Sequence, residues 1–523
     1  MKKTKVLVCL LLILPLAGPG GKPNRRTGLE SPERSKLQTE LRRCSERFRA
    51  GRIEEAFACF ESGRELALSL GHGDLASRFL SNSASCELAR RRYQPALEHL
   101  TRARALARES GDTGTRAITE ANIASVYEQM GDTAAAARWA VRALHGIEPG
   151  HLPKVLIQLA SLRSRQGRAE EAFKLFEEGI RRADAAADLA TWALGCDRMG
   201  EELYKAGRLD AAEAAMLAAY RVRKLNRLPA LETSYRNLGR LYLARGDTPL
   251  AGALLERGLA ARPSGFVPSW DLYHTRGRVR LAEGRPAAAL QDFRAAVALV
   301  RNWRARVAAE DGARMGSEQL LQQAYSGLVR AAALLYLRTG RPALLRECFE
   351  AAEENRAASL RALLATRTEP DLLPRLQRVL GPSQSYIGFH LDEPESWRWV
   401  LNRHGLRLRR LPGRAAIAAQ LRQFRQDLKG EDLYRTLFAG LDASAEGSRR
   451  WLLALDEDLF AAPLAALAAA RRDGRTVRLV ERHEIQIVSG AGLLAAKGGS
   501  ACARGKQPAW RLRPRQAAPP CKV

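Results

Sequence analysis

The chain has 523 residues, 46% of them apolar and only 6% aromatic, which excludes a wholly disordered chain and favours helices over sheets. Its length exceeds that of one ordinary domain, so two or three domains are expected. The formal net charge is +28, but the basic residues are mostly Arg and are spread along the whole chain, which argues against a nucleic-acid-binding surface.

The first 22 residues have the pattern of an export signal. Lys2, Lys3 and Lys5 precede an apolar run from Val6 to Leu16, which is too short for an ordinary membrane span. Residues 1–22 are therefore predicted to be a signal peptide or an uncleaved signal anchor, and to make the only membrane contact. A bacterial lipoprotein would carry a Cys at the position of Pro19, so lipid attachment is not expected. The predicted location is the bacterial cell envelope or periplasm, or the cytoplasm if the start codon is mis-called.

A short turn pattern recurs through the following residues at intervals of 36 to 40. Gly is followed by Arg or Asp, and an Ala stands five residues after the Gly. Such a period indicates a solenoid of helical hairpins that bury their apolar faces against their neighbours. Each Gly is expected to end the first helix of its hairpin in a left-handed conformation. The turn glycines are Gly51, Gly131, Gly167, Gly207, Gly246 and Gly284, and Arg91 takes this place in the second unit.

Residues around each turn specify the kind of solenoid. Gly239 precedes the turn glycine of the sixth unit by seven residues and Leu255 follows it by nine; Gly277 and Phe293 hold the same places in the seventh unit. A small residue at the first place lets the two helices of a hairpin approach closely. This pattern resembles the tetratricopeptide repeat (TPR) family over residues 37–300, in about seven units. The resemblance implies an α-α superhelix that binds a peptide or a protein.

The same resemblance implies that the first helix of each hairpin lines a concave groove. Carrying the groove positions over gives Arg236, Arg240, His274 and Arg278 as candidate partner-binding residues. The members of each pair are four residues apart and share a helix face. Adjacent repeats would then form a basic clamp for a carboxylate or an acidic peptide. The alternative is a solvated basic face without a partner.

Beyond the repeats, the helical pattern continues without a period. Residues 301–366 are predicted to be a helical connector, with an amphipathic helix from Glu350 to Leu360. Pro370, Pro374 and Pro382 then mark a boundary. The alternation of Trp397, Trp399 and Leu401 is typical of a strand. The strands expected after the boundary are Tyr386–Leu391, Trp397–Leu401, Leu406–Leu408, Trp451–Leu455 and Glu484–Val488, with a helix at Ala415–Leu428.

Residues 383–490 resemble part of a CHAT domain, a caspase-like α/β fold. The matching segments are Ala352–Leu360 in the preceding helix, then Trp399–Leu401, Leu433–Leu437, Leu453–Leu467 and Leu479–Ile485. In that family the catalytic His and Cys lie downstream of the matched region. Here residues 491–523 instead form a basic, Pro-rich, low-complexity tail. The resemblance therefore gives no catalytic residue.

The eight cysteines show no CxxC pair and no spacing with His that a zinc site needs. No metal and no cofactor are expected. Cys44 and Cys59 lie inside helical patterns, where each fits as a small apolar residue. A Cys44–Cys59 bridge would fit an exported chain.

These observations predict a mainly α protein: a TPR-type α-α superhelix followed by a partial α/β, CHAT-like segment. The predicted function is a non-catalytic scaffold or adaptor that binds a protein or peptide, acidic in character, in the TPR groove. The alternative is a CHAT-family cysteine peptidase whose catalytic His/Cys half is lost by truncation or frameshift. A nucleic-acid-binding solenoid ranks last, because export and diffuse charge argue against it.

Overall fold

The computed structural model describes residues 31–90, 92–261, 269–306, 313–356, 372–472 and 475–497. The chain divides into two compact units, Met1–Ala324 and Tyr325–Val523. The predicted signal segment 1–22, Arg91, residues 357–371 with Pro370, and residues 498–523 of the predicted tail lie outside the described residues, so the predictions made for them stay predictions. Residues 491–497, predicted as the start of that tail, form a short helix. No helix within the described ranges is both long and apolar enough to cross a membrane.

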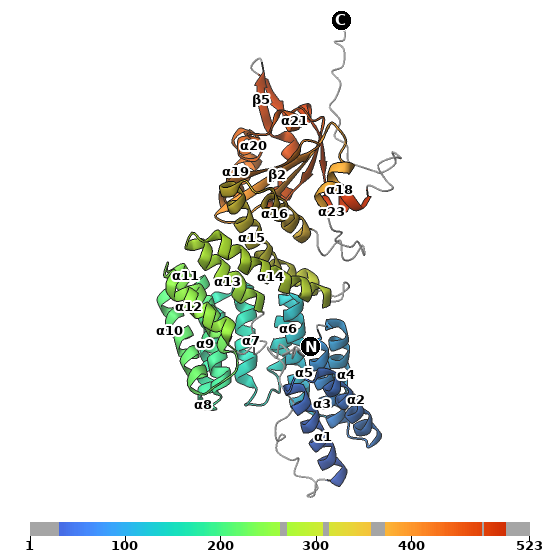
Figure 1. Cartoon of the computed structure of the whole chain (residues 1–523). Coiled ribbons are helices and arrows are strands. Elements are labelled where there is room, and N and C mark those ends of the chain that lie inside the picture. The colour runs from blue at the N-terminus through green and yellow to red at the C-terminus, as the bar shows by residue number, and fades with distance from the viewer. Residues whose placement is uncertain are drawn as a thin grey trace. The chain divides into compact units, whose positions relative to one another are not determined.

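The first unit is a row of helical hairpins (Figure 1). The two helices of each hairpin pack together, and the first helices of neighbouring hairpins also meet, as in α1–α3, α3–α5, α7–α9, α9–α11 and α11–α13. We call α3, α5, α7, α9, α11 and α13 the inner helices. The fourteen helices of these hairpins are α1 (Pro32–Arg49), α2 (Ile53–Ser69), α3 (Gly73–Ala89), α4 (Tyr93–Glu109), α5 (Thr113–Met130), α6 (Thr133–Ala143), α7 (Leu152–Arg165), α8 (Ala169–Ala185), α9 (Leu189–Lys205), α10 (Leu209–Leu225), α11 (Leu231–Ala244), α12 (Thr248–Ala260), α13 (Ser269–Ala282) and α14 (Pro286–Arg306).

The turns inside the hairpins follow the predicted pattern. All six turn glycines have φ between 71° and 86°, the left-handed conformation that glycine adopts without a steric cost. The Ala five residues later is at most 1% exposed in every unit, because it faces the preceding helix. These alanines are Ala56, Ala96, Ala136, Ala172, Ala212, Ala251 and Ala289.

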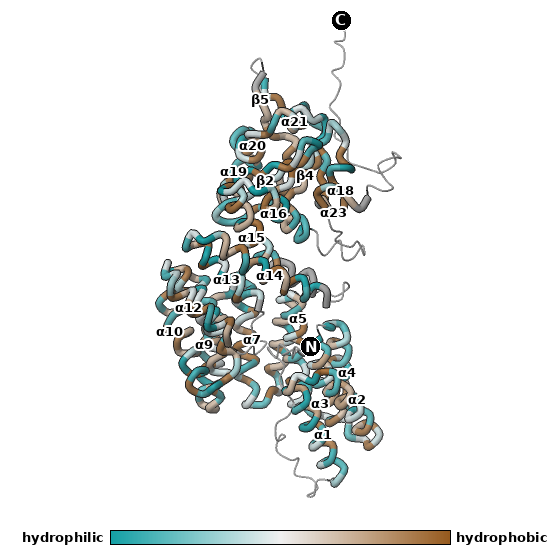
Figure 2. The backbone as a smooth tube through the Cα atoms, viewed as in Figure 1, coloured by the Kyte–Doolittle hydropathy of each residue, from teal (hydrophilic) through white to brown (hydrophobic). Residues whose placement is uncertain are grey.

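The close approach of paired helices is also confirmed. A Cβ atom on Gly239 would lie 2.8 Å from Cγ of Leu255, and one on Gly277 would lie 2.8 Å from the ring of Phe293. Such separations are too short for a real side chain, so both glycines are required by packing. In Figure 2, apolar and hydrophilic stretches alternate along the helices of this unit, as expected for helices that bury one face.

The second unit contains a five-stranded sheet of order β3-β2-β1-β4-β7. Strands β1, β4 and β7 are parallel, whereas β1, β2 and β3 form an antiparallel meander. The strands are β1 (Gln384–His390), β2 (Glu395–Asn402), β3 (Gly405–Pro412), β4 (Arg450–Ala454) and β7 (Glu484–Ile487). All five strands predicted from sequence are confirmed. In the part of the chain that the structure describes, β7 pairs only with β4, so the outer edge of β7 is unpaired. The side chain of Ile487 in this strand is 59% exposed.

Helices cover both faces of this sheet. On one face, Ile387 and Phe389 of β1 pack with helices that follow β3. On the other face, Tyr386 and Trp399 contact Phe349, with ring centroids 6.2 and 6.4 Å apart. Every residue of β2 is buried, as expected for a strand that is covered on both faces. The helices of this unit are α15 (Ala313–Thr339, which begins in the first unit), α16 (Pro342–Asn355), α18 (Leu372–Val379), α19 (Arg414–Asp427), α20 (Glu431–Phe438), α21 (Ala443–Glu446), α22 (Leu479–Arg482) and α23 (Ala491–Lys497).

A small two-stranded sheet was not predicted from the sequence. It pairs β5 (Ala468–Arg472) with β6 (Arg475–Arg478) in antiparallel register. Two short 3-10 turns, Glu457–Ala461 and Leu464–Ala466, connect β4 to this hairpin.

Candidate interaction site on the inner helices

Polar side chains link consecutive inner helices. Nδ2 of Asn122 donates to Oγ of Ser81 at 3.2 Å, which joins α5 to α3. Nε2 of Gln158 donates to Oγ of Ser125 at 3.1 Å, which joins α7 to α5. Asn122 and Gln158 are both buried, and buried polar groups need such partners. These two hydrogen bonds therefore join the second, third and fourth hairpins to one another.

Ion pairs also link first helices, as between Arg165 of α7 and Glu128 of α5, and a cluster of them lies in the last three hairpins. Arg236 of α11 lies between Asp271 of α13 and Glu201 of α9 and forms an ion pair with each. Its Nη1 is 3.0 Å from Oδ2 of Asp271, and its Nε donates to Oδ1 of Asn237 at 3.0 Å. One arginine thus joins three successive inner helices.

The pKa values of this cluster reflect its burial and its charges. Burial pushes the pKa of Glu201 upward, but the positive charges of Arg236, Arg198 and Arg240 outweigh burial and hold it below its ordinary value. Burial likewise acts to lower the pKa of Arg236, yet the carboxylates of Glu201 and Asp271 raise it. Both side chains are therefore charged at neutral pH.

A second ion pair lies deeper, between Arg223 of α10 and Asp197 of α9. Both side chains are buried. Nη1 of Arg223 also donates to Oγ of Ser234 at 2.8 Å, and Nδ2 of Asn237 lies 3.5 Å from Oδ1 of Asp197. These contacts tie α9, α10 and α11 together beneath the Arg236 cluster.

The four predicted groove residues lie on α11 and α13, but they have different surroundings. Arg236 forms its ion pairs with Glu201 and Asp271 inside the protein. The guanidinium of Arg240 is 5.8 Å from the ring centroid of Tyr204 on α9, within reach of a cation–π contact. Arg278 is exposed on α13.

His274 is 7% exposed, and its ring centroid is 5.8 Å from that of Phe293. Burial, reinforced by the positive charges of Arg278 and Arg240, lowers the pKa of His274 to about 4. The imidazole is therefore neutral at pH 7. Of the four predicted groove residues, Arg240 is partly exposed and Arg278 is exposed, whereas His274 is buried and Arg236 is largely buried in its ion pairs. Their contact with a partner stays a prediction.

The sequence reasoning missed the acidic members of the site. Glu201 stands six residues before its turn glycine, the place that Arg240 and Arg278 occupy in the next two units. Asp271 stands three residues before His274 on the same helix face. Aligning the units at their turns would have found both. Their pairing with Arg236, which lies 35 residues from each, depends on how the hairpins stack.

The described cysteines are either bonded or buried. Cys44 of α1 and Cys59 of α2 form a disulfide, beside the carboxylate of Glu40. Burial raises the pKa of the Cys86, Cys196 and Cys348 thiols to about 12, so these three thiols stay protonated at neutral pH. A thiol nucleophile needs the opposite shift. Cys502 and Cys521 lie outside the described residues.

The second unit has its own buried polar cluster, at the carboxyl ends of β1 and β4. Oγ of Ser326 lies 3.1 Å from Nε2 of His390, and Nδ1 of His390 lies 3.7 Å from Oδ2 of Asp456. This order of groups resembles a hydrolytic triad, but 3.7 Å exceeds hydrogen-bond length. Ser326 and His390 are also buried. We therefore interpret these contacts as part of the packing of α15 against the sheet.

Comparison with known proteins identifies the repeats. The tetratricopeptide repeat family model matches residues 75–148, a stretch that runs from α3 into the turn after α6, and no curated protein matches the chain. Similar solved structures include the apo quorum sensor NprR from B. thuringiensis (18% identity, 63% of this chain and 89% of that chain, TM-score 0.42). Others are a Rap protein complexed with Competence and Sporulation Factor (15%, 63% and 90%, 0.45) and a tetratricopeptide repeat protein from Parabacteroides merdae (18%, 55% and 99%, 0.37). The family match and the turn geometry together show that the chain carries tetratricopeptide repeats, followed by a small sheet-containing region.

Proposed function

We propose that this chain is an interaction scaffold whose inner helices bind an acidic segment of a protein partner. The observation that carries the proposal is the arrangement around Arg236. Arg236 is held by Glu201 and Asp271, whereas Arg240 is partly exposed on α11 and Arg278 is exposed on α13, so a partner can reach both guanidiniums from solvent. These two residues hold equivalent places in adjacent repeats, so a chain lying across the repeats would meet both.

The rigidity of the inner helices supports this role. The buried contacts Ser81–Asn122, Ser125–Gln158 and Arg223–Ser234 each join two neighbouring hairpins. A partner would therefore meet side chains that are already held in place, which lowers the entropic cost of binding. Arginine suits this task because its planar guanidinium pairs with a carboxylate through two parallel hydrogen bonds.

The proposal extends to location and to the second unit. Export is supported by the charged and apolar pattern of residues 1–22 and by the Cys44–Cys59 disulfide, since disulfides persist in oxidising compartments. The partial CHAT-like assignment of residues 383–490 is supported by the strands found at the predicted positions. In this proposal the second unit has no catalytic role.

The test uses a short fluorescent peptide rich in glutamate and its glutamine-rich counterpart. Fluorescence anisotropy measures the affinity of the full chain for each. The double variant Arg240→Glu/Arg278→Glu should bind the acidic peptide at least about tenfold more weakly, because each substitution replaces attraction with repulsion. The wild-type affinity should also fall as salt is added.

A charge-matched control is Arg168→Glu/Arg181→Glu, which reverses two exposed arginines at α8, a second helix of its hairpin. This control should keep most of the affinity. If both double variants lose affinity equally, the binding reflects net charge alone and the proposed site is wrong. Equal affinity for the acidic and the glutamine-rich peptide would also contradict the proposal.

A further inference from the structure

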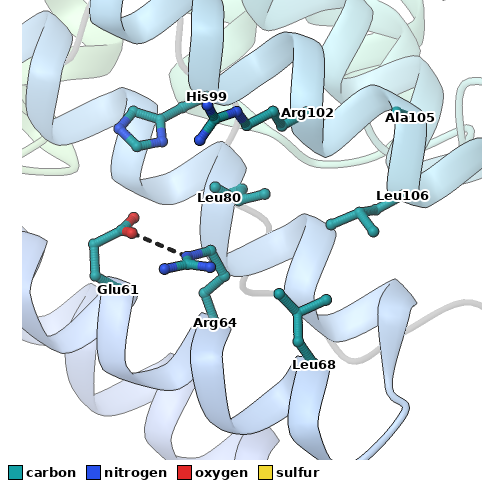
Figure 3. A pocket seen from close by; sticks show the side chains of 8 residues that line it. All are labelled: Glu61, Arg64, Leu68, Leu80, His99, Arg102, Ala105 and Leu106. Atoms are coloured by element: carbon teal, nitrogen blue, oxygen red, sulfur yellow. Dashed lines mark hydrogen bonds and ion pairs between the residues drawn. The ribbon is translucent and has the colours of Figure 1, made fainter.

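A pocket of about 350 Å³ lies between α2 and α4, the second helices of the first two hairpins. Glu61, Arg64 and Leu68 line it from α2, and their spacing of three and four residues places them on one helix face. Leu80 of α3 lies between the two walls (Figure 3). Apart from Leu80, the lining residues belong to α2 and α4, so the pocket is separate from the Arg236 cluster on α9, α11 and α13.

The wall formed by α4 repeats the order of the wall formed by α2. His99, Arg102 and Leu106 have the same spacing as the three residues of α2. Figure 3 shows that His99 lies across from Glu61 at one end, whereas Leu106 lies towards Leu68 at the other. The pocket therefore has a polar end and an apolar end.

The two arginines at the polar end of the pocket differ in their ion pairs. Arg64 is paired with Glu61 and with Glu65, each at 2.9 Å. Arg102 is exposed and has no ion pair among the residues that the structure describes. Nδ1 of His99 is buried and has no hydrogen-bond partner within the same described ranges. Because Nδ1 is itself buried, a molecule in the pocket meets the exposed guanidinium of Arg102 rather than this nitrogen.

We propose that this pocket binds a small organic anion composed of a carboxylate and a short aliphatic chain. The carboxylate accepts hydrogen bonds from the exposed guanidinium of Arg102, while the aliphatic chain lies against Leu68, Leu80 and Leu106. A volume of about 350 Å³ is at the lower end of small-molecule sites. A cation would be repelled by Arg102, and a purely apolar molecule would leave the charge of Arg102 without a counter-ion.

The two halves of the ligand are tested separately by calorimetric titration of the full chain. The probes are octanoate, octylammonium, which reverses the charge of the head group, and acetate, which lacks the aliphatic chain. Octanoate should bind, and the other two should bind at least about tenfold more weakly. If acetate or octylammonium binds as well as octanoate, or if octanoate does not bind, the proposal is wrong.

Matched variants assign the binding to this pocket. Arg102→Glu should weaken octanoate binding about tenfold or more, whereas Arg108→Glu, an exposed arginine on the same helix outside the lining residues, should not. Leu68→Asn should weaken binding severalfold, whereas Leu66→Asn should have no effect. Leu66 and Leu68 are 42% and 43% exposed on the same helix, but only Leu68 lines the pocket. Equal effects within either pair would overturn the assignment.

A last comparison distinguishes two sources of a carboxylate with an aliphatic chain: a peptide C-terminus and a free aliphatic acid. N-acetyl-leucine presents the carboxylate and side chain of a peptide C-terminus, and N-acetyl-leucinamide lacks the charge. Tighter binding of N-acetyl-leucine than of octanoate would identify a peptide C-terminus as the natural occupant. The reverse order would identify a free aliphatic acid. Binding of the amide as tightly as the acid would exclude the carboxylate contact and overturn the proposal.

Discussion

Arg236 and Asp271 form an ion pair of 3.0 Å between neighbouring hairpins. The same guanidinium pairs with Glu201 of the preceding hairpin. Each of the three side chains is largely buried, so each charge depends on the others for its solvation. Through Arg236 alone, its repeat therefore forms an ion pair with the repeat before it and with the repeat after it.

Replacing Arg236 with Ala should destabilise the repeats by about 3 kcal/mol, because it leaves two partly buried carboxylates without a partner. Chemical unfolding followed by circular dichroism measures the loss. Hydrogen exchange should show that protection falls first in α9, α11 and α13. The matched control is Arg181→Ala, which removes an exposed pair with Glu178 and should cause no measurable loss. A similar loss of stability in both variants would mean that the buried cluster stabilises the repeats no more than an exposed ion pair does.

His274 should make the stability of the repeats depend on pH. Its pKa of about 4 in the folded chain lies below its ordinary value of 6.5. Below pH 6.5 the unfolded chain takes up a proton at this position and the folded chain does not, so stability falls as the pH falls towards 4. Above pH 6.5 both states are neutral and the histidine contributes no pH dependence. The shift corresponds to at most about 3 kcal/mol.

The variant His274→Gln isolates this effect, because glutamine does not titrate. The difference in unfolding free energy between wild type and variant should be constant above pH 6.5 and should shrink or reverse between pH 6.5 and 4. The charged groups that act on His274 are Asp271, Arg278 and Arg240. They are unchanged in the variant, so their own titration largely cancels. A pH-independent difference would show that His274 is not held neutral.

The sequence predicts the parts of the fold that depend on local patterns. Turn glycines such as Gly246 must adopt a left-handed conformation, and Gly239 must leave room for Leu255; both requirements are visible in the residue type. Strand β2 is equally visible through its alternating Trp397 and Trp399. The β5–β6 hairpin was missed because Ala468–Arg472 has a composition that favours helices, and only its pairing with β6 makes it a strand.

The candidate site was only partly predictable for a similar reason. The position of Arg236 and Arg240 on a first helix follows from the repeat. Whether a given arginine faces a partner or an internal carboxylate depends on residues about one repeat away, here Glu201 and Asp271. The burial of His274 likewise depends on how α13 packs with α14. Repeat position gives the helix face but not the partner of each charge.

The Cys44–Cys59 disulfide should contribute to the stability of the first hairpin. It joins α1 to α2 across 15 residues, and a cross-link of that length stabilises by about 3 kcal/mol, largely by restricting the unfolded chain. Reductant should lower the unfolding midpoint of the wild type and have no effect on Cys44→Ser/Cys59→Ser. Without reductant, thiol-alkylating reagents applied to the unfolded chain should leave Cys44 and Cys59 unmodified, as peptide mass mapping would show. Their modification would mean that the two cysteines are reduced.

Arg356 should be among the least replaceable residues of the second unit. Its guanidinium donates to the backbone carbonyl of Leu455 at 2.5 Å and to that of Phe389, and its Nε is 3.1 Å from Oε1 of Glu353. Oε1 of Glu353 also accepts from the hydroxyl of Tyr386 at 2.7 Å. The pair thus joins α16 to the carboxyl ends of β1 and β4. Arg356→Met should therefore cost about 3 kcal/mol or more, because it leaves the buried carboxylate of Glu353 without its positive partner and removes the side-chain donor to two backbone carbonyls.

The double variant Glu353→Gln/Arg356→Met measures how much of that loss arises because the carboxylate of Glu353 stays buried without a counter-ion. Removing the carboxylate as well should recover part of the stability, since glutamine can still accept from Tyr386 without a net charge. Arg435→Met is the matched control, because Arg435 pairs with Asp432 at the surface and its loss should not be measurable. Urea unfolding monitored by hydrogen exchange in β1 and β4 measures all four proteins. If the double variant is less stable than Arg356→Met, the burial of Glu353 is not the main cost.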